Sequence, residues 1–273
     1  MLFRSLSSQL GSRVTRRLKE PIIRAIFRQM DGFFSIGSLN SEFYKRFGAA
    51  QNKIFNVPYA VDNEFFQKMC SDAAPRREKL RASLALEPNR PVILFASKFI
   101  ARKRAVDLLE AYIRLSEDGS SEPYPYLLFV GSGEEQESLE SRAAQTGWSS
   151  IKFLGFKNQT ELPAFFDLCD VFVLASEAEP WGLIVNEVMN AGRAIIVTDQ
   201  VGAAPDLVID NENGYVVPAR DVGALSDRLK TVTSNPNIAK RMGESSLRRI
   251  QEWDFGRDIA GIEASLIATV GLR

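Results

Sequence analysis

From Pro91 onward the chain alternates short apolar runs with longer stretches in which apolar residues recur every three or four positions. Continuous apolar runs are typical of strands buried on both faces of a parallel sheet. The stretches between them have the helical period, as after Asp221, a favourable N-cap followed by Leu225 and Leu229 on one face. This alternation predicts an α/β fold with a doubly wound, Rossmann-like parallel sheet. The predicted strands are 92–97, 126–131, 151–155, 171–176, 194–198 and 214–218.

The pattern before Pro91 does not complete a second sheet of this kind. Two apolar runs, 33–37 and 53–57, predict strands, and the segment between them is predicted to form a capped helix that ends at Gly48. Residues 62–89 are polar and interrupted by prolines, which is typical of a linker with a helix in it. We therefore expect four parts: a partial N-terminal domain (1–60), a linker (61–89), a doubly wound domain (90–252) and a C-terminal helix (253–273).

Composition narrows the classes of function. The 273 residues are 45% hydrophobic and 25% charged, which is typical of a soluble globular protein. Because 34 basic and 34 acidic residues cancel, we do not expect nucleic acid as a partner. The absence of histidine argues against Ser-His-Asp hydrolases and zinc proteases. Two cysteines suit a reducing compartment, so we expect a cytoplasmic protein without a resident metal.

The first thirty residues are basic, since Glu20 is their only acid. Ile22, Ile26 and Met30 lie on one predicted helical face, opposite Arg24 and other cations. Two interpretations stay open: this face contacts the inner surface of an anionic membrane peripherally, or it covers the core of a domain.

Ligands of open parallel sheets bind beyond the carboxyl ends of the strands, so the loops there are candidate sites. After 92–97 come four cations, among them Lys98 and Lys103, which form either a solvated basic face or a phosphate site before a helix. After 126–131, Gly131 and Gly133 begin a dinucleotide fingerprint without its third glycine. A tight turn is therefore the simpler interpretation.

The segment "EAEPWGLIVNEVMNAG", residues 177–192, follows the strand 171–176. Glu179 lies in the loop, Gly182 allows a ligand to approach the backbone, and Glu187 lies one turn into the next helix. Helix amides suit a phosphate, and carboxylates accept hydrogen bonds from hydroxyls. The arrangement therefore favours a ligand that is anionic at its centre and hydroxylated at both ends, such as a nucleotide-sugar.

This segment resembles the motif of two glutamates separated by seven residues in retaining GT-B glycosyltransferases of family 4. The resemblance extends over most of the chain, through "SKFIARKRAVDLLEAY", "FVGSGEEQESLE", "VGAAPDLVIDNENGYVVPARDVGAL" and, before the domain, "KIFNVPYAVDNEFF". It implies the C-terminal half of a GT-B fold and transfer of a sugar from a nucleotide-sugar to a glycan or lipid-linked acceptor, as in polysaccharide biosynthesis.

The resemblance also implies residue roles. Lys98 and Lys103 would hold the donor diphosphate, Glu179 the transferred sugar and Glu187 the ribose hydroxyls. Further donor contacts would come from Gly131, Gly133, Gly182, Leu183 and Ile184. No metal or other cofactor is implied.

The chain departs from the family at several points. Lys98 replaces an arginine, which keeps the charge but loses the planar fork, and Asp206 replaces a glutamate. The family's acceptor domain, which carries a histidine near the reacting sugar, is not matched. We therefore expect donor binding without efficient transfer unless a separate polypeptide completes the cleft.

Three alternatives remain open on the sequence. A nucleotide-sugar epimerase shares the fold and the donor site, and a non-catalytic subunit would bind the donor only. A glycoside hydrolase would need Glu179 and Glu187 about 5 Å apart across an open sugar site.

Overall fold

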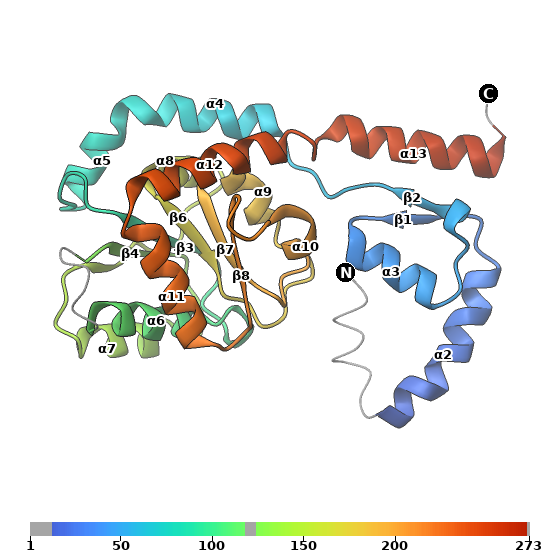
Figure 1. The fold of residues 1–273 in the computed structure, drawn as a ribbon, viewed down its shortest axis with the longest axis horizontal. Helices are drawn as coiled ribbons and strands as arrows, with labels where there is room; N and C mark the ends of the chain where they lie inside the picture. Colours follow the sequence, from blue (N-terminus) through green and yellow to red (C-terminus); the bar gives the residue numbers. More distant parts are fainter. Residues whose placement is uncertain (1–12, 118–123, 272–273) are drawn as a thin grey trace.

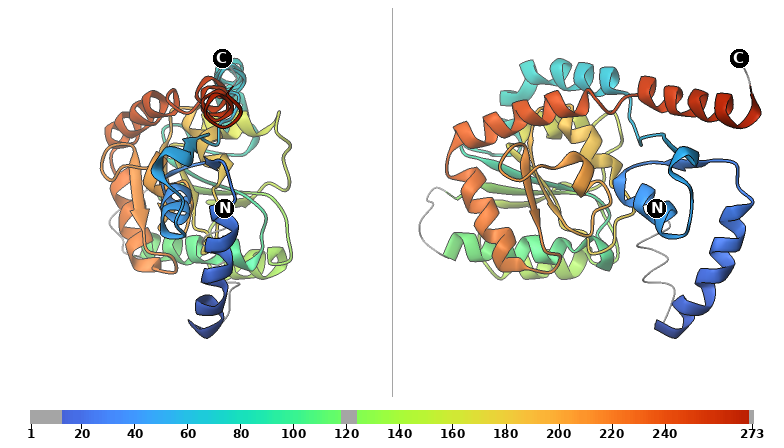
Figure 2. Two further views of the ribbon diagram at one scale, coloured as in Figure 1. Left: turned by 90° about the vertical axis from the view of Figure 1, so that its right-hand side faces the viewer. Right: turned by 45° about the vertical axis from the view of Figure 1, so that its right-hand side comes forward.

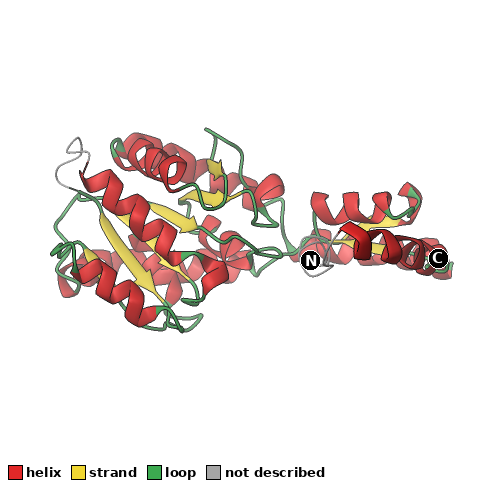
Figure 3. Cartoon of the chain, turned by 90° about the horizontal axis from the view of Figure 1, so that it is seen from below, coloured by secondary structure: helices red, strands yellow, loops and turns green. Residues whose placement is uncertain are grey.

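The computed structural model describes residues 13–117 and 124–271. Arg4, one of the predicted N-terminal cations, lies outside the described residues. The chain forms two lobes joined by a narrow waist (Figure 3). The small lobe contains α2 (Arg13–Arg28), β1 (Phe33–Ser35), α3 (Ser38–Arg46), η1 (Gln51–Lys53), β2 (Ile54–Asn56) and, from the other end of the chain, α13 (Phe255–Val270).

The large lobe is built around a six-stranded parallel sheet with the order β5-β4-β3-β6-β7-β8 (Figure 1). This order confirms the predicted doubly wound α/β fold. Its topological switch point lies between β3 and β6, which pair through Ile93 with Val171 and Leu94 with Phe172. The strands are β3 (Val92–Ala96), β4 (Tyr126–Val130), β5 (Ile151–Phe153), β6 (Val171–Leu174), β7 (Ala194–Thr198) and β8 (Gly214–Val217).

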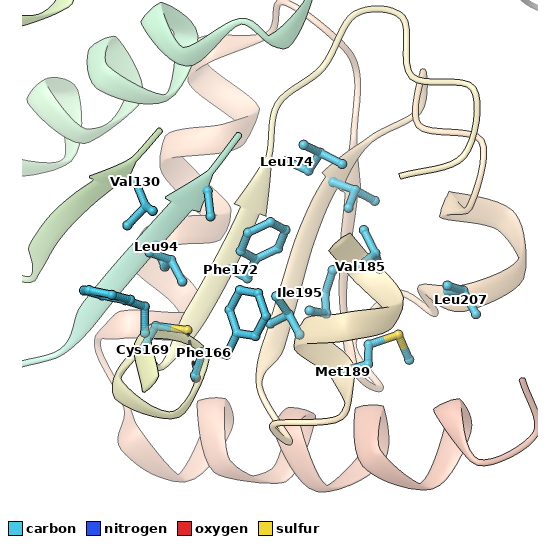
Figure 4. Close-up of a cluster of buried hydrophobic side chains, with 14 of the residues drawn as sticks. Leu94, Val130, Phe166, Cys169, Phe172, Leu174, Val185, Met189, Ile195 and Leu207 are labelled. Carbon is cyan, nitrogen blue, oxygen red and sulfur yellow. Dashed lines mark hydrogen bonds between the residues drawn. The ribbon is translucent and has the colours of Figure 1, made fainter. Parts of the chain in front are cut away.

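Helices cover both faces of this sheet (Figure 2). Every residue of β3, β4 and β7 is buried, which explains why these strands are continuous apolar runs in the sequence. Figure 4 shows one side of the core, where Phe166 and Phe172 lie side by side and Met189 extends the same cluster from α9. The large lobe's helices are α4 (Asn63–Ala73), η2 (Ala74–Arg76), α5 (Arg77–Ser83), η3 (Ala101–Lys103), α6 (Ala105–Glu117), α7 (Gln136–Ala144), α8 (Leu162–Leu168), α9 (Leu183–Met189), α10 (Ala204–Leu207), α11 (Val222–Thr233) and α12 (Pro236–Ile250).

The segment that the sequence presents as a linker with one helix contains two helices, α4 and α5. Asp62 caps α4 by accepting a hydrogen bond from Phe65 N at 2.9 Å, and Pro75 lies in η2, where one helix gives way to the next. Phe66 and Cys70 of α4 are buried in the core beside α8. This part of the chain therefore belongs to the packing of the large lobe.

In the small lobe β1 and β2 form a parallel pair, and α13 lies against β2. The three residues of the apolar helical face predicted near the N-terminus, Ile22, Ile26 and Met30, are exposed. The adjacent Phe27 packs against Phe33, Phe43 and Phe47. Exposed large apolar side chains gather on the small lobe at Ile22, Ile26, Met30, Phe34, Ile259, Ile262, Leu266, Ile267 and Val270. Within the described ranges, none of the helices has the length and apolar character needed to cross a membrane.

Candidate functional site

A cleft of about 570 Å³ opens beyond the carboxyl ends of β3 and β4, next to the switch point. Five of the nine predicted site residues line it: Lys98, Gly131, Gly133, Ile184 and Glu187. The other four, Lys103, Glu179, Gly182 and Leu183, belong to the adjoining loops and to the start of α9. The cleft lies at the place where ligands of doubly wound sheets bind.

Gly131 and Gly133 let two loops of the cleft lie in direct contact. A methyl group on Gly131 would fall 1.9 Å from Ser97 O, and one on Gly133 would fall 2.2 Å from Phe99 O. The loops are also tied by a hydrogen bond from Phe99 N to Ser132 O at 2.9 Å. These glycines form a tight turn that shapes the wall of the cleft.

The basic loop after β3 is partly neutralised by acids of the loop after β6. Lys103 Nζ forms an ion pair with Glu179 Oε2, and their side chains are only 13% and 11% exposed. Arg104 binds Asp107 and lies 3.8 Å from Glu177 Oε2. Lys98 is exposed, lines the cleft and has no ion pair with the described residues. It is therefore available to an anionic ligand.

The loop after β6 is held in place by backbone contacts before α9 begins. Glu179 N donates to Gln200 O at 3.2 Å, and Gly202 N donates to Glu179 O at 2.9 Å. Gly182 precedes Leu183 with a φ of 96°, a left-handed conformation that glycine adopts without steric cost. The loop thus enters α9 at a sharp turn directly over the sheet.

Glu187 lies in α9 and lines the same cleft as Lys98. Burial raises its pKa to about 7, and no described side chain or backbone group donates a hydrogen bond to its carboxylate. A carboxylate in this state gains from a ligand that donates hydrogen bonds to it, because such bonds replace lost solvation.

The segment after β5 contributes three cleft residues that the sequence analysis did not identify: Phe156 and Lys157 from the loop, and Leu162 from the start of α8. Phe156 is 73% exposed and lies at the cleft, where its ring is accessible to a ligand. The predicted strand 151–155 ends at the same edge of the sheet as its neighbours, so the rule that identified Lys98 would also have identified this loop.

Trp181 joins the candidate site to both connections between the lobes, and sequence reasoning missed this. Its indole lies 5.9 Å from the ring of Tyr59 and 5.3 Å from that of Trp253. Its Nε1 donates to Asn186 Oδ1 at 3.0 Å, and Asn186 Nδ2 donates to Tyr59 O at 3.0 Å. The site and the waist therefore form one packed unit.

Asp206, which stands where the family motif has a glutamate, caps α3 of the small lobe. Both of its carboxylate oxygens accept from Ser38 N, at 2.9 and 3.2 Å. Burial raises its pKa, although the Ser38 hydrogen bond opposes the shift. The aspartate side chain, shorter than the glutamate of the family motif, thus connects α10 to the start of α3.

No group of three or more Cys, Asp or Glu side chains in the described ranges is arranged to hold a metal ion. Independence from metal stays a prediction.

Comparison with known proteins places these features in context. Residues 76–249 match the family described as "Glycosyl transferases group 1". Lipopolysaccharide core biosynthesis glycosyltransferase LpsE of Rhizobium meliloti is 30% identical over 166 residues, 60% of this chain and 46% of that protein. The GDP-mannose-dependent α-(1-6)-phosphatidylinositol monomannoside mannosyltransferase of Mycobacterium tuberculosis is 27% identical over 247 residues, 85% of this chain and 60% of that protein. The chain thus spans about half the length of these relatives.

Solved structures show the same fold. Sucrose-phosphate synthase of Thermosynechococcus elongatus superposes with a TM-score of 0.73 at 22% identity, over 97% of this chain and 66% of that one. HepE of Anabaena, in complex with UDP-glucose, superposes with a TM-score of 0.72 at 19% identity, over 94% and 69%. These neighbours are GT-B glycosyltransferases. The family match over residues 76–249, more than half of the chain, establishes that the chain belongs to the group 1 glycosyltransferases.

Proposed function

We propose that this chain supplies the donor-binding half of a retaining glycosyltransferase that uses a nucleotide-diphosphate-sugar. The observation that carries this proposal is the cleft at the switch point, where the exposed cation Lys98 and the half-buried carboxylate Glu187 line one cavity. A cation suits a diphosphate, and a carboxylate without donors suits the hydroxyls of a ribose.

The remaining predicted residues fit around such a donor. Lys98 and Lys103 bind the diphosphate, and backbone amides at Gly182, Leu183 and Ile184 face it from the start of α9. Glu179 accepts hydrogen bonds from the transferred sugar. Because Lys103 and Glu179 are paired with each other in the free chain, donor binding must divide this pair between phosphate and sugar.

The proposed chemistry is departure of the nucleoside diphosphate from the anomeric carbon. Negative charge grows on the leaving oxygen, so fixed cations and amides stabilise the transition state more than the ground state. The charge of Lys98 and Lys103 serves this purpose without a metal ion.

The acceptor side of the reaction requires more than the small lobe provides. We infer that the exposed apolar surface of α2, β1 and α13 is covered by the rest of an acceptor domain, which a separate polypeptide could supply. The acceptor is then a glycan or a lipid-linked sugar, handled in the cytoplasm or at the inner face of the membrane. The curated relatives described above are transferases, so we do not propose the epimerase.

One experiment separates these functions. The purified chain is incubated with UDP-glucose, GDP-mannose or an ADP-sugar, each together with a mixture of glycan acceptors whose hydroxyls can receive the sugar, and the anomeric protons are followed by NMR. Formation of a glycoside with the donor's anomeric configuration supports a retaining transferase. Donor signals that broaden without turnover indicate donor binding alone, whereas a new sugar nucleotide would reveal an epimerase. Absence of any interaction with all three donors would contradict the proposal.

A further inference from the structure

Helix α9 presents different residues to the candidate donor cleft and to the interior of the protein. Ile184 and Glu187 line the cleft. Asn186, in the helix, and Asn190, directly after it, are only 0% and 3% exposed. Buried amide side chains need hydrogen-bond partners. The partners of these two asparagines lead to the two connections between the lobes.

Asn186 links α9 to the first connection, residues 57–62. Its Nδ2 donates to Tyr59 O at 3.0 Å, and its Oδ1 accepts from Trp181 Nε1 at 3.0 Å. The Trp181 ring in turn lies against the rings of Tyr59 and Trp253. Asn186 therefore uses both halves of its amide group to hold α9 against the waist.

Asn190 links the other end of α9 to the second connection, residues 251–254, through Asn63. Asn190 Nδ2 donates to Asn63 Oδ1 at 2.8 Å. Asn63 Nδ2 then donates to the backbone oxygens of Ile250 and Trp253, at 3.1 and 3.2 Å. Hydrogen bonds thus run from α9 to both connections.

These hydrogen bonds fix a direction that the apolar contacts of α9 do not. Val185, Val188 and Met189 bury the helix in the core, but hydrophobic burial is non-directional. A fully satisfied buried polar network, in contrast, specifies one arrangement. The waist therefore sets the orientation of α9, and this orientation sets where Glu187 lies in the cleft.

We propose that Asn186 and Asn190 are positioning residues of the donor site, which orient α9 from the waist and couple nucleotide affinity to the connections between the lobes. The inference rests on the donor binding proposed above and adds a dependence on residues away from the ligand. Such coupling is reciprocal, so a nucleotide in the cleft also restrains the connections. Among the described residues, none that lines the cleft belongs to either connection, so α9 transmits this restraint.

Asn186→Leu and Asn213→Leu form a matched pair of variants. Both asparagines are 0% exposed, and Asn213 accepts from Ile209 N at 2.7 Å and donates to Leu207 O at 2.8 Å. These three residues are not part of the cleft lining. Of UDP, GDP and ADP, the nucleotide that the parent chain binds most tightly is titrated into both variants by calorimetry. Asn186→Leu should bind it at least about 5-fold more weakly, whereas Asn213→Leu should bind like the parent.

Trp181→Phe is a milder variant of the same contact. It keeps an aromatic ring between the connections and removes the indole N–H that donates to Asn186. It should weaken nucleotide binding in the same direction. If Asn186→Leu does not fold, a Trp181→Phe chain that binds like the parent would overturn the inference.

Hydrogen exchange of the backbone amides, followed by mass spectrometry with each protein saturated with nucleotide, tests the reciprocal effect. Bound nucleotide should slow exchange at residues 57–62 and 251–254 in the parent and in Asn213→Leu, and clearly less in Asn186→Leu. A merely structural role of Asn186 would leave this response intact.

The outcomes separate this inference from the donor site on which it rests. Equal affinities of Asn186→Leu and Asn213→Leu would overturn the inference and leave the donor site in place. Connections that the bound nucleotide does not protect in the parent, or still protects fully in Asn186→Leu, would do the same. A parent chain that binds none of the three nucleotides would instead contradict the donor site, and this inference with it.

Discussion

Lys103 and Glu179 form an ion pair across the switch point, although 76 positions separate them in the sequence. Each is predicted to bind a different part of the donor. The pair therefore keeps two charged groups neutralised and largely buried until a ligand provides phosphate oxygens for one and hydroxyls for the other.

Lys103→Ala should destabilise the free chain by about 3 kcal/mol, because removal of one partner leaves the Glu179 carboxylate buried without its cation. Glu179→Ala should act similarly, and the double variant should cost clearly less than the sum. Urea unfolding of the four proteins measures the coupling, which we expect at about 0.5 to 3 kcal/mol. Strictly additive changes would show that the pair contributes nothing.

Glu187 should make stability depend on pH. Its pKa of about 7 lies above the ordinary value of 4.5, so the folded chain retains a proton that the unfolded chain has lost. The resulting contribution to the free energy of unfolding is complete below pH 4.5 and is lost as the pH rises through about 7. It amounts to at most roughly 3 kcal/mol. Glu187→Gln should remove this part of the slope in urea unfolding between pH 4.5 and 7.5, and an unchanged slope would assign it to another group.

Donor affinity should show the opposite trend at the same residue. Ribose hydroxyls donate to the ionised carboxylate, so binding of UDP-glucose should strengthen as the pH rises through about 7. A sugar nucleotide is the suitable probe because its phosphates, unlike the terminal phosphate of UDP, do not titrate in this range. Glu187→Gln should bind more weakly with no such trend.

Gly131→Ala and Gly133→Ala should disrupt the cleft, because the added methyl group would collide with the backbone at Ser97 or Phe99. We expect loss of nucleotide binding and destabilisation by more than about 2 kcal/mol. Gly147→Ala is a suitable control, since Gly147 also has a positive φ but has nothing within 4 Å of the added methyl group. Its cost should stay near 1 kcal/mol, from backbone strain alone. Equal effects at the three positions would mean that close packing of the loops is unimportant.

Asp206 should control how firmly the small lobe is attached. Asp206→Ala removes the acceptor for Ser38 N, so amide exchange at the start of α3 should accelerate, with a cost of about 1 kcal/mol. Asp206→Asn retains a capping oxygen and should exchange more slowly than the alanine variant. Unchanged exchange at Ser38 in both variants would exclude this contact as a connection between the lobes.

Local patterns in the sequence predict the sheet well, because β3 and β7 are buried along their whole length and are therefore apolar throughout, apart from Thr198 at the end of β7. The same rule predicts that loops such as those of Lys98 and Glu179 meet at one edge. Contacts between distant segments leave no such periodic signal. The pairing of Lys103 with Glu179 and the packing of Trp181 on Trp253 depend on tertiary geometry, which only the structure supplies.

The central claim is that the cleft lined by Lys98 and Glu187 binds the nucleotide of the donor. Calorimetric titration of UDP, GDP and ADP into the parent chain tests it most directly, with Lys98→Ala and Glu187→Ala as variants. Lys240→Ala and Glu244→Ala, exposed on α12, are matched controls. The parent should bind at least one nucleotide, the two cleft variants should bind it roughly 10- to 150-fold more weakly, and the controls should be unchanged. A parent chain that binds none of the three, or cleft variants that bind as tightly as the controls, would contradict the claim.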